Sequence, residues 1–128
     1  MTNTEEKKIV LAIDDNAVQL GIFKNILVPR YDLRTVMSAS TAMNYLNQNK
    51  ADVILLDIEM PNISGFDFLS DIRKIPSYMI VPIIIVSGKK EPDFYVEAKK
   101  SSAFDVLLKP VEPISLINVI EKALAASV

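Results

Sequence analysis

The stretch VILLDIEMPNISG, residues 53–65, begins with apolar residues and places Asp57 directly after them. A short run of Val, Ile and Leu is typical of a strand that is buried on both faces of a sheet. Met60-Pro61 and Gly65 follow and indicate that the chain turns just beyond the strand. An acid in this place is a turn former, a helix cap or a functional carboxylate, and for Asp57 taken alone the first two are commoner.

Three other short apolar runs also end on polar residues. They are Ile9 to Ile13 before Asp14-Asp15, Ile83 to Val86 before Ser87, and Val106 to Leu108 before Lys109-Pro110. Tyr31 to Met37 alternates more, which suits a strand at the edge of a sheet. Apolar stripes at helical spacing separate or follow the strands, and Ser64 is the expected cap of the third helix. The stripes lie within Val18–Leu27, Ala42–Leu46, Phe66–Ile72, Phe94–Ser101 and Ile114–Leu124.

Strand and helix therefore alternate along the whole chain. Buried strands that alternate with helices require parallel pairing, right-handed crossovers and helices on both faces of the sheet. We expect an α/β doubly wound sheet with the three most apolar strands at its centre. The carboxyl ends of parallel strands share one edge, where ligands bind in such folds. That edge should bring together Asp14, Asp15, Asp57, Ser87 and Lys109.

Length and composition indicate one domain and exclude several kinds of chemistry. The chain has 128 residues, and we expect a polar tail at residues 1–6 before a domain at residues 7–128. It has no cysteine and no histidine, which excludes disulfides, thiolate ligands and imidazole catalysis. A net charge of −2 gives no reason to expect nucleic acid or an anionic membrane as a partner. The polar start and the short apolar runs predict a cytoplasmic protein that does not cross a membrane.

Three carboxylates on one edge repel one another, and a bound cation would relieve that repulsion. Oxygen ligands alone favour Mg²⁺, with Mn²⁺ as an alternative, and protein-bound Mg²⁺ usually also binds phosphate oxygens. A carboxylate is already deprotonated at neutral pH and can accept a phosphoryl group without a general base. In this interpretation Lys109 and Ser87 bind the remaining phosphoryl oxygens.

Each of these residues also has a simpler explanation. Asp14-Asp15 suits the start of a helix, Ser87-Gly88 suits a turn, and Lys109-Pro110 suits a surface loop. Four independent turns need not place three acids, a hydroxyl and a lysine on one edge. Their joint placement is what favours the functional interpretation.

The set of motifs resembles the receiver domain of two-component response regulators over nearly the whole chain. In length it is similar to the single-domain chemotaxis regulators of the CheY type. The resemblance implies a flavodoxin-like, CheY-like three-layer sandwich with five helices and a five-stranded parallel sheet in the order 2-1-3-4-5. It rests on Asp14-Asp15, on Asp57 with Met60-Pro61 and Gly65, on Ser87-Gly88 and on Lys109-Pro110.

The resemblance also implies a role for each site residue. Asp57 would be the phosphoacceptor, Ser87 the hydroxyl that follows the phosphoryl group, and Lys109 its ion-pair partner. Gly88 would keep the entrance open, and the peptide bond between Lys109 and Pro110 would be cis. The implied magnesium ligands are Asp15 directly, Asp14 mainly through water, Asp57, and the main-chain carbonyl of Glu59.

The function implied is a phosphorylation-dependent signalling switch of a two-component phosphorelay, with no enzyme activity beyond self-catalysed phosphotransfer and autodephosphorylation. The donor would be a phosphohistidine on a sensor histidine kinase or a histidine phosphotransfer protein. A downstream protein or output domain would bind the face made by the fourth helix, last strand and last helix. No nucleic acid or membrane contact is expected.

Several residues depart from the pattern of the family. Val106 stands where members usually carry Tyr or Phe, and Ser102 replaces a usual glycine. Phe104 lies on the same side of an extended strand as Val106 and is a candidate substitute, although an ordinary core or rim position is the simpler interpretation. We hypothesise that Glu59 and Lys89 flank the phosphoryl pocket with opposite charge and limit the approach of water.

Three alternative functions remain at this point. A phosphate sink or relay intermediate needs phosphotransfer but little conformational output, which fits Val106. A Mg²⁺-dependent phosphohydrolase with an aspartate nucleophile would resemble Asp-x-Asp, whereas this chain has Asp57-Ile58-Glu59. A binding module that is not phosphorylated would not need to keep costly like charges together.

Overall fold

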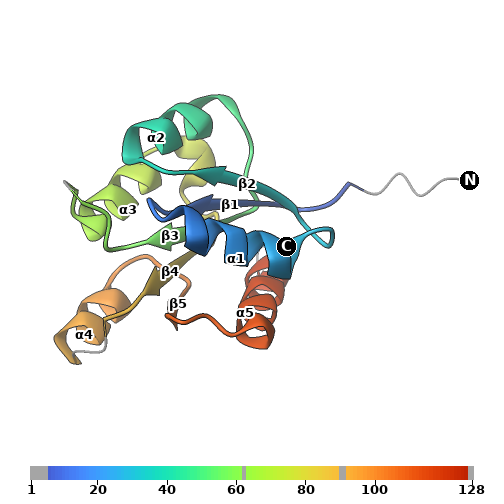
Figure 1. Cartoon of the computed structure of the whole chain (residues 1–128). Helices are drawn as coiled ribbons and strands as arrows, with labels where there is room; N and C mark the ends of the chain where they lie inside the picture. Colours follow the sequence, from blue (N-terminus) through green and yellow to red (C-terminus); the bar gives the residue numbers. More distant parts are fainter. Residues whose placement is uncertain (1–5, 62, 90–91, 127–128) are drawn as a thin grey trace, which may run out of the picture.

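Five parallel strands form one sheet at the centre of the molecule (Figure 1). The computed structural model describes residues 6–61, 63–89 and 92–126, so most of the predicted tail lies outside the described residues. The strands are β1 (Ile9–Ile13), β2 (Asp32–Val36), β3 (Val53–Asp57), β4 (Ile83–Ser87) and β5 (Asp105–Leu108). Each agrees with a predicted strand to within one residue at either end.

The strand order is β2-β1-β3-β4-β5, which confirms the predicted doubly wound sheet and its order. All of β3 and β4 is buried, as is β1 after its first residue, because these strands have a neighbour on each side and helices on both faces. The edge strands β2 and β5 are partly exposed. The most apolar runs of the sequence therefore form the centre of the sheet, as predicted.

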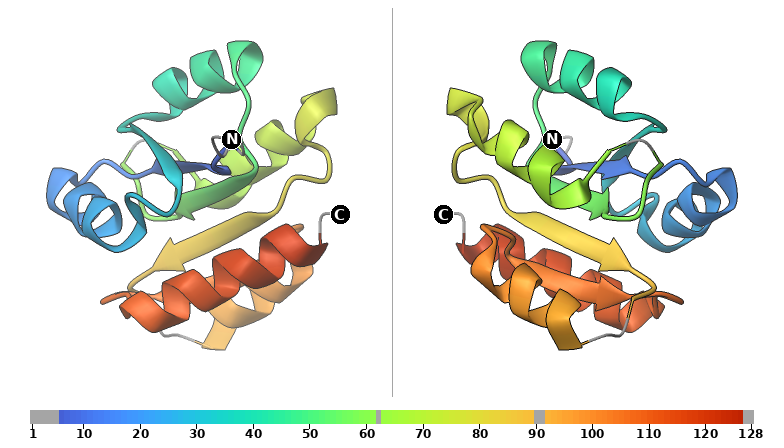
Figure 2. Two further views of the ribbon diagram at one scale, coloured as in Figure 1. Left: turned by 90° about the vertical axis from the view of Figure 1, so that its right-hand side faces the viewer. Right: turned by 90° about the vertical axis from the view of Figure 1, so that its left-hand side faces the viewer.

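The helices form a layer on each face of the sheet (Figure 2). They are α1 (Ala17–Leu27), α2 (Ala39–Gln48), α3 (Gly65–Arg73), α4 (Pro92–Lys100) and α5 (Pro113–Ala126), with a short 3-10 helix, η1, at Pro76–Tyr78. Side chains of α2, α3 and α4 pack on one face with Leu56 of β3, while those of α1 and α5 pack on the other with Leu55. Successive side chains of a strand point to opposite faces, so both cores draw on the same short runs.

Short polar side chains start the first three helices. Ser64 caps α3 by accepting a hydrogen bond from the Asp67 N–H, as predicted, and Ser38 caps α2 in the same way. The cap of α1 is Asn16, whose side chain accepts from the backbone of Val18 and Gln19. Asp14 and Asp15 therefore do not cap this helix, so one of their simpler explanations does not apply.

Arg73 joins three segments at the edge where the strands begin. Its guanidinium donates to the carbonyls of Tyr78 (2.9 Å) and Val81 (2.5 Å), and to both the side-chain and main-chain oxygens of Ser102 (3.0 and 2.7 Å). The two ends of the described chain, residues 6 and 126, also lie on this side of the molecule (Figures 1 and 2). The predicted site lies at the opposite edge, where the strands end.

Two local features were not predicted, the 3-10 helix and a cis peptide bond between Val28 and Pro29. None of the described helices combines the length and apolar character that are needed to cross a bilayer.

Candidate functional site

The structure brings the three predicted acids together at the carboxyl edge of the sheet. Asp14 follows β1 and is 1% exposed, and Asp57 ends β3 and is 4% exposed. Asp15 is exposed beside them. Each acid offers one oxygen to a cluster in which all of these atoms lie within 4.8 Å of one another. This spacing suits a metal ion held by oxygen ligands.

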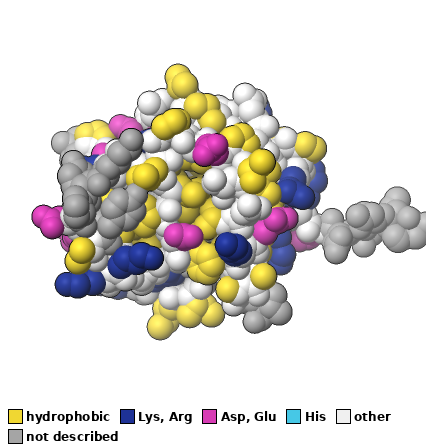
Figure 3. Space-filling model, turned by 90° about the horizontal axis from the view of Figure 1, so that it is seen from below, with side chains coloured by type: hydrophobic (Ala, Val, Ile, Leu, Met, Phe, Trp, Pro, Cys, Tyr) yellow, Lys and Arg dark blue, Asp and Glu magenta, His cyan; other side chains and the backbone are white. Residues whose placement is uncertain are grey.

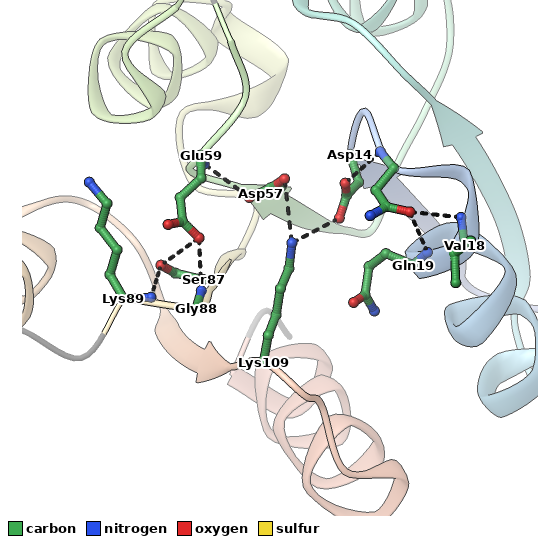
Figure 4. Close-up of polar contacts among 10 residues, drawn as sticks. Asp14, Val18, Gln19, Asp57, Glu59, Ser87, Gly88, Lys89 and Lys109 are labelled. Atoms are coloured by element: carbon green, nitrogen blue, oxygen red, sulfur yellow. Dashed lines mark hydrogen bonds and ion pairs between the residues drawn. The ribbon is translucent and has the colours of Figure 1, made fainter.

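Lys109 places its ammonium between the two buried carboxylates (Figure 4). Its Nζ lies 3.5 Å from Asp14 Oδ2 and 3.5 Å from Asp57 Oδ2. The residue directly follows β5, and its N–H donates to the Ser87 carbonyl (2.8 Å), which fixes the start of the loop against β4. The peptide bond to Pro110 is cis, as the family resemblance implied.

The carboxyl of Asp14 has a pKa that its surroundings clearly shift. The pKa of its carboxyl is raised from 3.8 to about 6, chiefly by burial and also by the charge of Asp57, against the lowering effects of the Asn16 N–H and Lys109. Within the described part of the chain, Asp14 Oδ2 accepts no hydrogen bond. One ammonium does not satisfy two buried carboxylates, so the site retains negative charge that a bound cation would stabilise.

The Asp57 carboxylate also supports the turn that follows its strand. Its Oδ1 accepts a hydrogen bond from the Glu59 N–H at 2.9 Å, which is the two-residue pattern of an Asx turn. The turn interpretation of Asp57 is thus correct, but it accounts for one carboxylate oxygen only. Oδ2 faces Lys109 and the other acids.

Gly65 ends the stretch VILLDIEMPNISG, where the close packing of the chain leaves no room for a side chain. A Cβ atom at this residue would lie 2.6 Å from the Ile58 carbonyl oxygen and would also overlap the Ile58 side chain. The glycine therefore lets the start of α3 approach the end of β3. This role is structural.

Ser87 and Glu59 form a second group of contacts beside Asp57 (Figure 4). Glu59 Oε1 accepts from Ser87 Oγ at 3.2 Å and from the Gly88 N–H at 2.8 Å. The Lys89 N–H donates to Ser87 Oγ at 3.0 Å. Ser87 is completely buried. Among the described residues no ion pair joins Glu59 to Lys89, but both residues line the same groove. Their effect on the approach of water stays a prediction.

Phe104 does not lie where a substitute for the missing aromatic residue would be needed. Its N–H bonds to the carbonyl of Ile83 at the start of β4, whereas Ser87 ends that strand. Four residues of strand separate these points by about 13 Å. Val106 pairs with Ile85 and packs partly buried against the core under α4. The structure therefore gives Phe104 no contact with the hydroxyl residue.

The family model of the response regulator receiver domain matches residues 10–121. The chain belongs to this family. The receiver domain is 34% identical to the two-component response regulator ARR10 of Arabidopsis thaliana over 113 residues, which are 86% of this chain and 20% of that protein. It thus spans about a fifth of the length of such a curated relative.

Solved structures agree with the fold. The chemotaxis protein CheY4 of Vibrio cholerae superposes with a TM-score of 0.85 at 27% identity, covering 92% of this receiver domain and 99% of that chain. A CheY-like receiver domain protein of Methanospirillum hungatei gives a TM-score of 0.85 at 24% identity, covering 94% and 96%. Receiver domains take part in phosphorylation-based signalling with a histidine kinase or phosphotransfer protein, and they bind Mg²⁺ at an acidic pocket. In this receiver domain Asp14, Asp15 and Asp57 form a cluster of acids that could hold such an ion.

Proposed function

We propose that this receiver domain accepts a phosphoryl group on Asp57 and acts as a phosphorylation-dependent switch in a two-component phosphorelay. The observation that carries the proposal is the setting of the Asp57 carboxylate, which is 4% exposed and lies 3.5 Å from the Lys109 ammonium beside two further acids. The donor is a phosphohistidine on a sensor histidine kinase or a histidine phosphotransfer protein. It must belong to another molecule or another segment, because these 128 residues contain no histidine.

In the transfer step an Asp57 carboxylate oxygen attacks the phosphorus atom of the donor. The new O–P bond forms as the P–N bond to the imidazole breaks, and the ring nitrogen leaves with the electron pair. Lys109 offsets the charge on one phosphoryl oxygen, and the Ser87 hydroxyl donates a hydrogen bond to another. Attack by water on the same phosphorus atom reverses the modification, so the chemistry is self-catalysed phosphotransfer and autodephosphorylation rather than turnover of a separate substrate.

The residues that would hold Mg²⁺ are Asp14, Asp15, Asp57 and the main-chain carbonyl of Glu59. Oxygen ligands within 4.8 Å of one another and a buried Asp14 oxygen that accepts no hydrogen bond from the described residues fit such an ion. The ion supplies positive charge that offsets the carboxylates and the incoming phosphoryl oxygens. Mn²⁺, which also prefers oxygen ligands, is a suitable replacement.

Exposed apolar side chains beside the site favour a protein as the donor. Val18 in the first turn of α1 is 73% exposed, and Ile114 in the first turn of α5 is 75% exposed. Both helices begin at the edge of the sheet that carries Asp57. A histidine-containing protein could therefore cover these side chains while its phosphohistidine reaches the carboxylate.

The output surface in this proposal is the face formed by α4, β5 and α5. Figure 3 views the molecule from this side and shows apolar side chains across it, interspersed with charged ones. Val96 on α4 is 52% exposed and Phe104 before β5 is 39% exposed. A downstream protein or output domain would bind here without nucleic acid or membrane contact, and we retain a cytoplasmic location as part of the proposal.

A phosphate sink or relay intermediate is the second candidate. It is favoured by Val106, which offers no ring to couple Ser87 with β5, and by the distance of Phe104 from that serine. In a sink, phosphotransfer to Asp57 would proceed while the face of α4, β5 and α5 stayed unchanged.

The test is to add Mg²⁺ and a small phosphodonor, to follow the gain of one phosphoryl group by intact-mass spectrometry, and to record backbone amide shifts with Mg²⁺ and beryllofluoride. We expect a stoichiometric adduct on the native protein and none on Asp57→Asn. Shifts that reach α4 and α5 indicate a switch, and shifts confined to the carboxyl edge indicate a sink. An adduct on Asp57→Asn, or no Mg²⁺-dependent change in the native protein, would contradict the proposal.

A further inference from the structure

The Ser87 hydroxyl, which is proposed to bind the phosphoryl group, already donates a hydrogen bond in this structure. A single oxygen, Glu59 Oε1, accepts both from Ser87 Oγ and from the Gly88 N–H. In Figure 4 the Glu59 side chain turns from the end of β3 toward Ser87 and Gly88. These two donors, at the end of β4, form a small seat for an anionic oxygen, and the Glu59 carboxylate fills it.

The hydroxyl of Ser87 can serve only one acceptor at a time. A serine hydroxyl has one proton to donate, and Ser87 Oγ already accepts a hydrogen bond from the Lys89 N–H, which directs its proton toward Glu59. A carboxylate oxygen and a phosphoryl oxygen also repel each other when they are close. Glu59 and a phosphoryl group on Asp57 therefore cannot use the seat together.

We infer that the Glu59 carboxylate is a resident anion in the seat formed by the Ser87 hydroxyl and the Gly88 N–H, and that a phosphoryl group on Asp57 must displace it. The inference rests on the proposed phosphorylation of Asp57. Glu59 thereby slows phosphorylation, because its charge-assisted hydrogen bonds have to break before the phosphoryl oxygen can take their place. This role differs from a screen against water, which would act on loss of the phosphoryl group.

A groove beside the seat receives the displaced side chain. It has a volume of about 690 Å³ and runs between the loop after β3 and α4. Glu59 is one of its lining residues, and Lys89 is the basic one among the described residues that line it. Phe66 of α3 and Phe94 of α4 also line it, and their rings lie 5.8 Å apart between centroids. When Asp57 is phosphorylated, the Glu59 side chain moves into this groove and changes the contacts of α4. This route to α4 does not need an aromatic residue at position 106.

Three variants test the inference through the initial rate of phosphorylation by a small phosphodonor with Mg²⁺, measured by intact-mass spectrometry. Glu59→Ala empties the seat, and we expect about a tenfold increase, of the order associated with losing hydrogen bonds to a charged group. Glu59→Asp keeps the charge but is one methylene too short to reach both donors, so it should also be faster. Glu97→Gln removes a charge from another residue lining the same groove and should leave the rate unchanged.

Amide spectra of the unmodified protein provide a readout that does not depend on phosphorylation. The Gly88 and Lys89 amide resonances should shift in Glu59→Ala and Glu59→Asp and stay in place in Glu97→Gln. In the native protein, beryllofluoride with Mg²⁺ should also shift the aromatic resonances of Phe66 and Phe94, and this response should shrink in Glu59→Ala.

The outcomes separate the inference from the proposed function. A native protein that is phosphorylated, with Glu59 variants that are equally fast or slower, would overturn the inference, since Glu59 would then be neutral or would hold the donors ready. Equal acceleration in Glu97→Gln would overturn it as well, by showing a general charge effect. Failure of the native protein and of all variants to accept a phosphoryl group would overturn the proposed function instead.

Discussion

The polar groups at the two ends of the strands are satisfied to different degrees. Where the strands begin, Arg73 donates four hydrogen bonds to oxygens of Tyr78, Val81 and Ser102. Where the strands end, two buried carboxylates share one ammonium, and the pKa of Asp14 is raised to about 6. A polar network that serves the fold is satisfied by the chain itself, whereas one that serves a ligand is left incomplete. This difference favours the edge where the strands end as the functional one, independently of any relative.

The largest loss of stability should follow from removing the hydrogen bonds that Arg73 donates where the strands begin. In Arg73→Ala the three carbonyls at residues 78, 81 and 102 lose their donor, and we expect the free energy of unfolding to fall by roughly 3–4 kcal/mol. Urea unfolding measures the loss. The initial rate of phosphorylation, measured under conditions in which the variant is folded, should stay close to that of the native protein. A stable variant with a much slower rate would show that the two edges are not separate in function.

The buried carboxylate of Asp14 should make the free energy of unfolding depend on pH. The pKa of Asp14 is 3.8 unperturbed and about 6 in the folded protein, so the folded protein binds more protons between these values. Stability from this group is therefore present at low pH and is lost as the pH rises through 4 to 6, by up to about 3 kcal/mol.

Other carboxylates also titrate in this range, so Asp14→Asn is the required reference. The difference in free energy of unfolding between the metal-free native protein and Asp14→Asn should move in favour of the variant as the pH rises from 4 to 7. Saturating Mg²⁺ at pH 7 should stabilise the native protein more than the variant. If the difference in free energy of unfolding did not change with pH, the pKa of Asp14 would not be raised in the folded protein.

Gly65 tests whether every residue at the functional edge serves function. The Cβ atom of Gly65→Ala would lie 2.6 Å from the carbonyl oxygen of Ile58, so the start of α3 must move away from β3. We expect a loss of about 2 kcal/mol in the free energy of unfolding. Thermal unfolding with and without Mg²⁺ should show the same loss, because the clash is independent of the metal.

Gly88, which follows β4 at the same edge, should give the smallest effect. A Cβ atom there would meet only Glu59 Oε1, at 3.7 Å, which is an ordinary contact. Gly88→Ala should therefore change the free energy of unfolding by less than about 0.5 kcal/mol. The same unfolding series measures it, and a loss as large as that of Gly65→Ala would show that the loop after β4 is packed more tightly than this contact indicates.

The fold and the placement of the acids could be predicted because they depend on patterns that a sequence displays directly. The runs at Ile9, Val53 and Ile83 are too apolar for any place but the centre of a sheet, and parallel pairing then brings Asp14 and Asp57 to one edge. The cap at Ser64 was likewise predictable from residue type and position. Their roles as ligand and phosphoacceptor remain predictions.

The positions of individual side chains were not predictable in the same way. Glu59 and Lys89 were expected to flank the phosphoryl pocket, but the hydrogen bonds that the Glu59 carboxylate accepts from Ser87 and Gly88 were not predicted. Phe104 shares the parity of Val106, but the register of β5 against β4 places it far from Ser87. Such choices depend on the exact path of loops, which periodicity does not encode.

Both ends of the described chain leave from the edge that carries Arg73, away from the carboxylates. Additional sequence joined at either end would therefore start on the far side of the molecule from the site where the donor and the metal approach. With this arrangement the domain can be joined to different neighbouring domains while Asp57 stays accessible. The same holds for fusion to a reporter or an affinity tag. A fusion at the amino end and one at the carboxyl end are equivalent in this respect.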